Sequence, residues 1–481
     1  MIKQILTFIL TLYAFLNVSF GQGSNNQEPV FSTDELKADL KQLRTKLENN
    51  HPGLYLYSSK PAIDKVFDSL ENSILKPLTE LEFYRHITII SSIIKDGHTI
   101  LLPDEKITNS EGNIVNFLPY HFVILNNQLF IDMVYTGDNS IPAGSEITSI
   151  NNVAASEIIR LLSERQVRDG NNLTYPLWIL NNYFRQYYSF IFGRPASYSI
   201  DYKISGQANT ASVKALTKDS IYFYRQKNYP GKTFSNLPNE GLKLKIENGN
   251  KYAILTIKDF HNDVLKKEYK QNFDKVIAAY FEQINNSKTG NLVLDLRNNQ
   301  GGDIENGVYL LSYLLDKPFS VVREYNCVNN NEVLHCNGPS LGEHPPKPGN
   351  FKGKLYVLIN GGSFSNSGIV ASCLQANQRA TFIGQETGGN PSVISGFIKE
   401  IKLSNTKIRV QIPTKQFVIT SKANNNGQGI IPTELVIPKL TDILEDRDTE
   451  LDYTIDLINR TNNGGQQYAD GFRQDEHIKK P

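Results

Sequence analysis

Cysteine is scarce in this chain and neither sign of charge is in excess. Only three cysteines occur in 481 residues, which is too few for a disulfide framework or a multi-cysteine metal site. Lysine and arginine total 50 against 49 aspartates and glutamates, with no long basic run, so nothing in the charge favours nucleic-acid binding. Metal-ligand spacings and phosphate-binding loops are also missing. We therefore expect no metal, no organic cofactor and no nucleic-acid partner.

Five residues of the second half have structural interpretations. Cys327 and Cys336 flank a polar, asparagine-rich segment, and two alternatives stay open for them, a hairpin disulfide or two free thiols. Cys373 lies in an expected helix and is interpreted as a small core residue. Asp295 and Arg297 end an apolar strand, where we expect them to pair or to hold the following glycine loop.

An apolar run near the start is too short to cross a membrane. Residues 5–16 make up this run, whereas a membrane-spanning helix needs about 20 residues. A lysine precedes it, and the small residues Ser19 and Gly21 follow it, which is the layout of a secretory signal. We expect cleavage near Gly21, giving a signal peptide over residues 1–21, and export to the periplasm or beyond without a stable membrane anchor. A retained anchor is the alternative.

Residues 30–111 predict a helical N-terminal region. Ser32 with Glu35 forms a capping box before a run of leucines at helical spacing. A second capping sequence starts at Thr79 and predicts one helix that ends at residues 95–97, where a glycine suits a C-terminal cap.

The rest of the chain changes pattern twice. Residues 112–216 predict short strands with a helical insertion. Residues 243–440 alternate strand, turn and helix, including a helix over residues 268–284, and this alternation is typical of an α/β layer. Residues 441–481 predict a last helix over residues 442–458 and a tail.

Two strand-to-turn junctions have the features of an acyl-transfer site. Residues 291–303 (NLVLDLRNNQGGD) and 355–368 (LYVLINGGSFSNSG) each lead from an apolar strand into a glycine- or serine-rich turn before a helix. Acyl transfer needs a nucleophile, a base and donors for the oxyanion, and backbone amides at such turns are suitable donors. These junctions predict a serine peptidase.

Local pattern alone does not identify the nucleophile or the base. Ser363, Ser365 and Ser367 share one turn, which does not match the Gly-x-Ser-x-Gly elbow, and any one of them is equally suited to cap the next helix. His98 follows an expected helix end, where the negative end of the helix dipole favours an imidazolium. The alternative is a surface or capping histidine.

Five motifs occur in the order found in the C-terminal-processing (tail-specific) and tricorn-core serine peptidases, and the chain resembles this family. The motifs are residues 95–99 (KDGHT), 295–302 (DLRNNQGG), 363–368 (SFSNSG), 383–389 (IGQETGG) and 429–432 (GIIP). The resemblance implies an α/β fold with a crotonase-like catalytic core. Residues 141–152 resemble the second half of a PDZ domain, which implies a degenerate PDZ-like middle domain.

The resemblance also implies roles for individual residues. Ser365 becomes the nucleophile. The amide of Asn366 and an amide of Gly301 or Gly302 become the oxyanion hole. Each of these roles is implied by matching the motifs of the family to this sequence, position by position.

The resemblance identifies the base and the acid that orients it less directly. The tail-specific branch has a lysine where this chain has Asn390, which cannot accept a proton, so His98 becomes the base as in the histidine-using branch. Asp96, Glu386 and Asn390 are the candidates for orienting His98 or lining the site, with a purely structural hydrogen-bonding role as the alternative for Asp96 and Glu386.

The expected function is hydrolysis of peptides or unfolded proteins by Ser-His acyl-enzyme catalysis, as an endopeptidase or a carboxyl-terminal peptidase. Two alternatives stay open. One is a catalytically weakened homologue that binds peptides or hydrophobic ligands, as the retinoid-binding relatives of the family do. The other is a secreted esterase. The oligomeric state is left open by the sequence.

Overall fold

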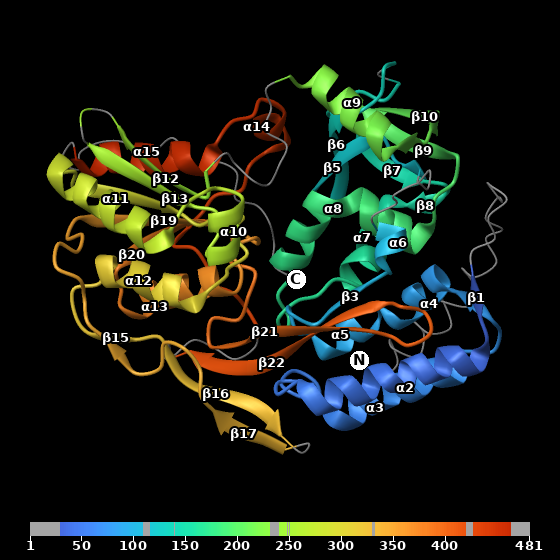
Figure 1. The fold of residues 1–481 in the computed structure, drawn as a ribbon. Helices are drawn as coiled ribbons and strands as arrows, with labels where there is room; N and C mark the ends of the chain where they lie inside the picture. Colours follow the sequence, from blue (N-terminus) through green and yellow to red (C-terminus); the bar gives the residue numbers. More distant parts are fainter. Residues whose placement is uncertain are drawn as a thin grey trace, which may run out of the picture.

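The computed structural model describes residues 29–108, 116–138, 140–230, 240–247, 249, 251–329, 332–419 and 427–462. Within these ranges the chain is a mixed helix-and-sheet protein whose elements are shown in Figure 1. The predicted signal peptide and the last residues of the predicted tail, 463–481, lie outside the described residues.

Helices dominate the first part of the chain. Capping boxes start α2 and α4, as predicted, because the hydroxyls of Ser32 and Thr79 each accept a hydrogen bond from the amide three residues later. The elements are β1 (Val30–Phe31), α2 (Thr33–Asn50), α3 (Lys60–Ser73), β2 (Leu78–Thr79), α4 (Glu80–Ile87), α5 (Ile90–Ile94), β3 (Ile100–Leu102) and α6 (Glu105–Thr108).

The prediction of a single helix from Thr79 onward is wrong, because the helix is interrupted at Thr88 and Ile89, which separate α4 from α5. Four consecutive β-branched residues, 87–90, cover this break, and such residues are poor helix formers. The left-handed cap of α5 is Lys95, with φ of 57°, rather than the glycine two residues later. The turn that follows carries His98.

An antiparallel sheet forms the middle of the chain, in the order β10-β9-β7-β6-β5, and α8 packs against β5. Side chains of the sheet, α7 and α8 share one apolar cluster. The elements are β4 (Asn116–Phe117), β5 (Tyr120–Leu125), β6 (Gln128–Val134), β7 (Glu146–Ile150), β8 (Val153–Ala154), α7 (Ala155–Glu164), α8 (Thr174–Phe192), β9 (Ser197–Ile204), β10 (Gln207–Lys214), β11 (Leu216–Thr217) and α9 (Lys218–Asn228).

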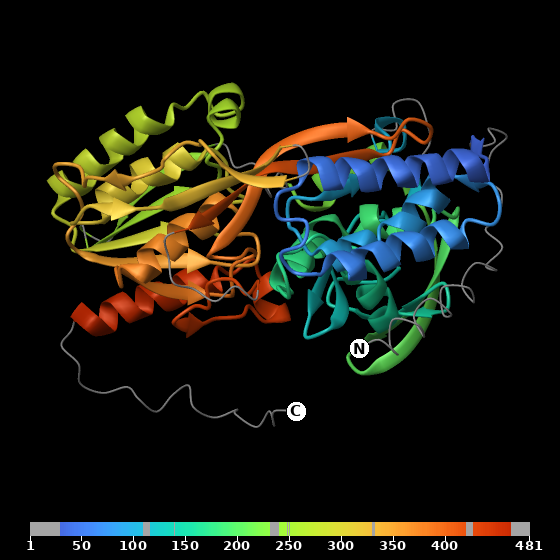
Figure 2. The same ribbon diagram turned by 90° about the horizontal axis from the view of Figure 1, so that it is seen from below.

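A second sheet, in the order β12-β13-β14-β19-β20-β23, is parallel from β13 onward. Helices cover both of its faces, since Leu292 and Leu294 pack with α11, α12 and α13, while Val293 packs with α15. Figure 2 shows α11 and α15 on opposite sides of this sheet. The apolar character of the strands follows from burial on both faces.

Strands and helices alternate along most of this parallel layer, as the sequence pattern predicts. Its elements are β12 (Leu242–Glu247), β13 (Tyr252–Ile257), α10 (Asn262–Lys267), α11 (Phe273–Ser287), β14 (Asn291–Asp295), α12 (Ile304–Leu314), β19 (Lys354–Ile359), α13 (Asn366–Ala376), β20 (Ala380–Gly384), β23 (Glu434–Leu435), α14 (Leu440–Leu444) and α15 (Thr449–Asn462). Between α12 and β19, β15 (Phe319–Ser320) and β18 (Glu343–His344) pair in a separate antiparallel ribbon. The helix predicted over residues 268–284 corresponds to α11, which begins only at Phe273. The single helix predicted over residues 442–458 is wrong, because this stretch contains two helices, α14 and α15.

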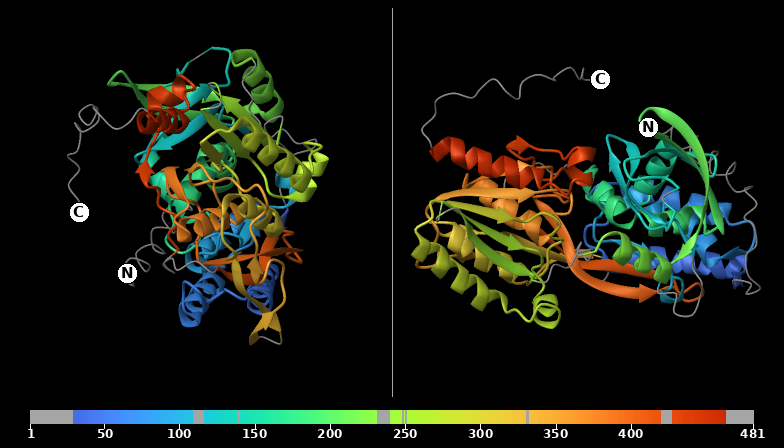
Figure 3. Two further views of the ribbon diagram at one scale, coloured as in Figure 1. Left: turned by 90° about the vertical axis from the view of Figure 1, so that its left-hand side faces the viewer. Right: turned by 90° about the horizontal axis from the view of Figure 1, so that it is seen from above.

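A long hairpin, β21 (Val393–Lys402) and β22 (Arg409–Ile419), extends from the parallel layer to the N-terminal helices, as Figures 2 and 3 show. Its strand β22 pairs with β3 on one side and with β16 (Val322–Asn329) on the other, and β16 pairs with β17 (Glu332–Cys336). Because β3 begins two residues after His98, this pairing helps to place the histidine relative to the parallel layer.

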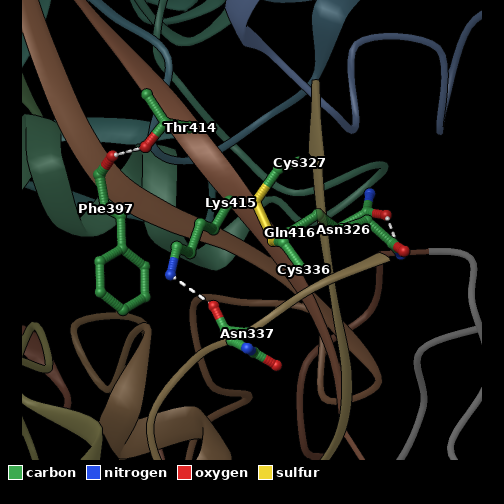
Figure 4. The surroundings of a disulfide bond; sticks show 8 residues. All are labelled: Asn326, Cys327, Cys336, Asn337, Phe397, Thr414, Lys415 and Gln416. Atoms are coloured by element: carbon green, nitrogen blue, oxygen red, sulfur yellow. Dashed lines mark hydrogen bonds between the residues drawn. A yellow bond between two sulfur atoms is a disulfide. The ribbon is translucent and has the colours of Figure 1, made fainter. Parts of the chain in front are cut away.

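The cysteine alternatives are resolved by a disulfide between Cys327 and Cys336, across β16 and β17. In Figure 4 it lies beside Lys415, whose ammonium donates to the carbonyl oxygen of Asn337 at 2.7 Å. Cys373 is a buried free thiol, in agreement with its interpretation as a core residue.

Arg297 forms the structural ion pairs expected at the end of β14. Its guanidinium lies 2.9 Å from Asp295, 2.6 Å from Asp448 and 3.2 Å from Glu450. The last two residues lie at the start of α15, so this arginine connects the strand end to the helix on the second face of the sheet.

No membrane-spanning helix occurs among the described residues, because none combines the required length with enough apolar character.

A buried carboxylate joins α2 to the tip of the long hairpin. Asp39 is fully buried and accepts hydrogen bonds from the amides of Asn405 at 2.9 Å and Thr406 at 2.8 Å, and from the Thr406 hydroxyl at 2.7 Å. An amide side chain of the same shape cannot accept at both of its terminal atoms.

We expect Asp39→Asn to lower the free energy of unfolding by about 1–3 kcal/mol, because it leaves a buried N–H donor without an acceptor. Chemical denaturation of both proteins would measure the difference. An unchanged midpoint and slope would show that the hairpin tip does not depend on this carboxylate.

Candidate active site

Ser365 lies between β19 and α13, at the N-cap of the helix, with φ of 54° and ψ of −121°. A positive φ is uncommon for a non-glycine residue and is retained where the surrounding structure imposes it. Ser363, by contrast, donates its hydroxyl hydrogen to the Leu296 carbonyl at 2.8 Å and accepts from the Asn360 amide at 3.1 Å. Ser363 therefore holds the turn together, and Ser367 is fully buried within the helix.

His98 meets Ser365 across 267 residues of sequence. Its Nε2 lies 3.1 Å from the serine Oγ, which is hydrogen-bond distance for removal of the hydroxyl proton. The imidazole ring stacks on Phe364, with ring centroids 4.6 Å apart and planes inclined by 30°. Phe364 directly precedes Ser365, so one aromatic ring supports the His98 imidazole beside Ser365.

The protonation state of His98 suits a proton acceptor. Burial lowers the pKa of His98 to about 4, although the Asp96 carboxylate opposes this shift. The imidazole is therefore neutral near neutral pH. If Nε2 accepts from Ser365, Nδ1 carries the hydrogen, and Nδ1 has no hydrogen-bond partner among the described residues.

Asp96 supports the backbone around His98 rather than its ring. One of its oxygens accepts from the His98 amide at 2.9 Å and from the Thr99 hydroxyl at 3.0 Å. The other lies 3.6 Å from Nε2 of His51. Burial raises the pKa of Asp96, but His51 and the hydrogen bonds outweigh it and leave the pKa below its usual value. Asp96 stays ionised at the base of the histidine turn.

Glu386 also fails to contact the imidazole. Its carboxylate accepts from the Asn172 side chain at 3.0 Å and from the Gly429 amide at 2.7 Å. It therefore joins two loops, which is the structural alternative considered for it. Within the described residues, neither predicted acid orients His98 through its ring.

Asn390 is fully buried and structural as well. Its side chain donates to the Tyr57 hydroxyl at 2.6 Å and accepts from the Ser392 amide at 2.8 Å. These bonds use the donor and acceptor of the amide group and hold the start of β21. No proton acceptor is provided by this side chain, as expected from its chemistry.

The glycine loop after β14 lies directly against Ser365. A Cβ added to Gly301, which has φ of 101°, would lie 2.7 Å from the Ser365 Cβ and 2.7 Å from the Asn366 nitrogen. The Gly301 amide itself donates to the side chain of Asn299 at 2.8 Å. In the described part of the chain, the amides of Gly302 and Asn366 have no such acceptor, so these two remain as candidates for the oxyanion donors.

One buried acid at the site has no signal in the sequence. Asp169 lies between α7 and α8 and accepts hydrogen bonds from the amides of Gly97 at 2.8 Å and Asn390 at 3.0 Å. Burial, with the neighbouring Asp96 carboxylate, raises the pKa of Asp169 to about 7, and the two amides oppose this shift. The residues beside Asp169 in the sequence (RDGNN, 168–172) form no motif that indicates a site.

An aromatic column connects α8 to the nucleophile turn. Tyr175 stacks on Phe364 with centroids 4.1 Å apart, and on Trp178 with centroids 6.0 Å apart. The Trp178 indole donates to the side chain of Asn298 in the glycine loop at 2.8 Å. The aromatic segment 175–192 thus packs beside the candidate site.

The assembled groups are those of acyl transfer. Ser365 is a candidate nucleophile, His98 a neutral imidazole within hydrogen-bond distance of it, and two amides without acceptors are candidate donors for a developing negative charge. Among the described residues, no cluster of three or more histidine, cysteine, aspartate or glutamate side chains has a metal-binding arrangement.

Sequence comparison relates part of this chain to known peptidases. The sequence model of peptidase family S41 matches residues 251–436. A carboxyl-terminal-processing protease of Synechocystis sp. is 26% identical over 194 residues, which cover 40% of this chain and 42% of that protein. A carboxy-terminal-processing protease of Bartonella bacilliformis is 31% identical over 159 residues, 32% of each chain. The matches therefore span less than half the length of these curated relatives.

Structural comparison extends the likeness to most of the chain. The crystal structure of mature CPAF has a TM-score of 0.66 and 13% identity, covering 90% of this chain and 99% of that chain. Mature CPAF complexed with lactacystin gives 0.66 and 14% identity over the same shares. At this identity the likeness shows a shared mixed helix-and-sheet fold.

We expect Gly97→Ala to slow covalent modification of Ser365 by a fluorophosphonate at least about tenfold, because small displacements of a reacting group have large effects on rate. The added Cβ would lie 2.5 Å from the ring of Phe364 and 3.0 Å from Asp169, so either the Phe364 ring, on which His98 stacks, or the histidine turn must shift. Mass spectrometry of the labelled protein would give the rate.

Gly290→Ala is the matched control, since a Cβ there meets nothing within 4 Å. Equal labelling rates for both variants and the parent would contradict the view that the fit around Gly97 places His98.

Proposed function

The chain belongs to peptidase family S41 through residues 251–436, and from this premise we propose that it is an exported serine peptidase that uses Ser365 as nucleophile and His98 as base. Its substrates are peptides or unfolded proteins, cleaved internally or near the carboxyl terminus. No cofactor takes part in this reaction. The carboxyl-terminal-processing relatives support this substrate class.

The observation that carries the proposal is the approach of His98 Nε2 to Ser365 Oγ at 3.1 Å beside two amides without acceptors. A serine hydroxyl is a weak nucleophile until a base takes its proton. The lowered pKa of His98 keeps that base unprotonated near neutral pH. The motif order and this geometry support the same pair independently.

The proposed reaction has two acyl-transfer steps. His98 Nε2 takes the hydroxyl proton as Ser365 Oγ bonds to the substrate carbonyl carbon, and the amides of Gly302 and Asn366 stabilise the oxyanion. The C–N bond then breaks, and His98 donates its proton to the leaving amine. A water molecule next attacks the acyl-enzyme, gives a proton to His98, and Ser365 regains that proton as the carboxylic acid leaves.

The proposed domain division follows the pattern changes in the sequence. A helical region over residues 30–111 carries His98, a PDZ-like domain over 112–216 contains the antiparallel sheet, and a crotonase-like core over 243–440 carries Ser365. Residues 441–481 are the proposed C-terminal part, of which the described residues to 462 are mainly helical. The apolar clusters of the middle and core parts lie within these bounds, apart from Leu242 directly before the core, and support the division. The cluster of the N-terminal helices also takes in Phe190 of α8 and four residues of the long hairpin, Leu403, Ile408, Val410 and Ile412.

Cleavage of a complex peptide mixture by the purified mature protein is the direct test of this function. We expect products that disappear with Ser365→Ala and with His98→Ala, since loss of either member lowers turnover by a factor of about 10⁴ or more in serine peptidases. Mass spectrometry would identify the cleaved bonds. Binding of peptides without cleavage by the folded parent would favour the ligand-binding homologue, and turnover of small acyl esters alone would favour the esterase.

The pH dependence of the His98 contribution gives a second test. We expect the ratio of parent to His98→Ala rates to stay high at about pH 5, where an ordinary histidine of pKa about 6.5 is protonated. The ratio should fall toward one only as the pH drops through the lowered pKa of about 4, because the protonated imidazole cannot take the Ser365 proton. Taking a ratio removes effects common to both proteins, and a fall centred near 6.5 would contradict a buried base.

A further inference from the structure

We propose that Asp169 is a positioning residue. It sets the distance between His98 Nε2 and Ser365 Oγ by holding the backbone segment that leads to each of these residues. This inference rests on the proposed Ser-His function and adds a residue that touches neither the reacting atoms nor the substrate. Asp169 lies in the loop between α7 and α8, 72 residues from Gly97 and 221 residues from Asn390 in sequence.

The two carboxylate oxygens of Asp169 serve two different segments. Oδ1 accepts from the amide of Gly97, the residue before His98, at 2.8 Å. Oδ2 accepts from the amide of Asn390 at 3.0 Å. One planar group therefore fixes the separation and direction of two backbone donors that belong to different parts of the fold.

Both segments lead directly to the candidate reacting groups. On one side, Gly97 is adjacent to His98. On the other, the Gly388 amide donates to the Ser363 carbonyl at 3.0 Å, two residues before Ser365. The path from base to nucleophile through Asp169 thus consists of backbone and one carboxylate, with few freely rotating bonds.

The loop around Asp169 is itself held against the histidine turn. The Gly170 amide donates to the Lys95 carbonyl at 2.9 Å. A Cβ on Gly97 would lie 3.0 Å from Asp169 Oδ1, and one on Gly389 would lie 3.2 Å from Oδ2. The two glycines allow both segments to approach the carboxylate closely.

The buried carboxylate of Asp169 depends on its two amide donors, because no cation compensates its charge. Asp169 is 2% exposed, and the groups that act on its charge are the two amides and the Asp96 carboxylate, with no cation among them. A buried carboxylate needs donors in place of water. The amides of Gly97 and Asn390 fill this need, so each bond that positions the site also stabilises the acid.

Asp169→Asn tests the proposal because it keeps the shape of the side chain and replaces one acceptor by a donor that faces an N–H group. We expect kcat for peptide cleavage to fall at least about tenfold while KM changes by less than about threefold, since the reacting geometry changes and the substrate contacts do not. Asp169→Glu, which keeps the carboxylate, should retain more kcat than Asp169→Asn.

Hydrogen exchange of the Gly97 and Asn390 amides gives a readout that does not require activity. We expect both amides to exchange faster in Asp169→Asn than in the parent. Asp39→Asn is the matched control, because Asp39 is a buried carboxylate that also accepts two backbone amides but holds the hairpin tip. It should leave kcat and the exchange of Gly97 and Asn390 as in the parent.

The outcomes separate this proposal from the proposed function. An active parent with unchanged kcat or unchanged amide exchange in folded Asp169→Asn would overturn the positioning role, as would an equal loss of kcat in Asp39→Asn. A parent with no Ser365-dependent cleavage would overturn the function, and the exchange comparison would still decide whether Asp169 holds the two segments.

Discussion

The contact between His98 and Ser365 is the constraint on which the candidate site depends, because the two residues come from different parts of the fold. A hydrogen bond of 3.1 Å tolerates only small relative movement. Strand pairing between β3 and β22 joins these parts through backbone hydrogen bonds, with Ile100 opposite Gln411. This strand pairing therefore links the segment that contains His98 to the part of the fold that contains Ser365.

Orientation of the imidazole follows from packing in this structure. Nδ1 of His98 has no acceptor among the described residues, whereas an acid would normally fix the ring through this atom. Stacking between His98 and Phe364, and between Phe364 and Tyr175, restricts the ring instead. Because Phe364 precedes Ser365, movement of the turn would displace nucleophile and ring support together. Burial meanwhile keeps the imidazole neutral near neutral pH by lowering the pKa of His98.

Features that depend on neighbouring residues could be predicted from the sequence, and features that depend on distant partners could not. The capping boxes at Ser32 and Thr79, the apolar strands and the turn that contains Ser365 all have local signals. The hydrogen bond that the Gly301 amide donates to the Asn299 side chain cannot be predicted without the conformation of the loop. Asp169 was missed for a related reason, since both of its donors are remote in sequence and nothing in its own surroundings distinguishes it.

Buried carboxylates connect separate segments in this protein by two different physical means. Glu450, at the start of α15, pairs with the guanidinium of Arg297 at the end of β14, and charge attraction acts over a range of orientations. Asp39 and Asp169 instead accept backbone amides, and such bonds require both distance and direction. An ion pair holds two elements together, but a carboxylate shared by two amides also sets their relative orientation. A site assembled from remote segments needs the second kind of connection, which is the kind found between the segments of His98 and Ser365.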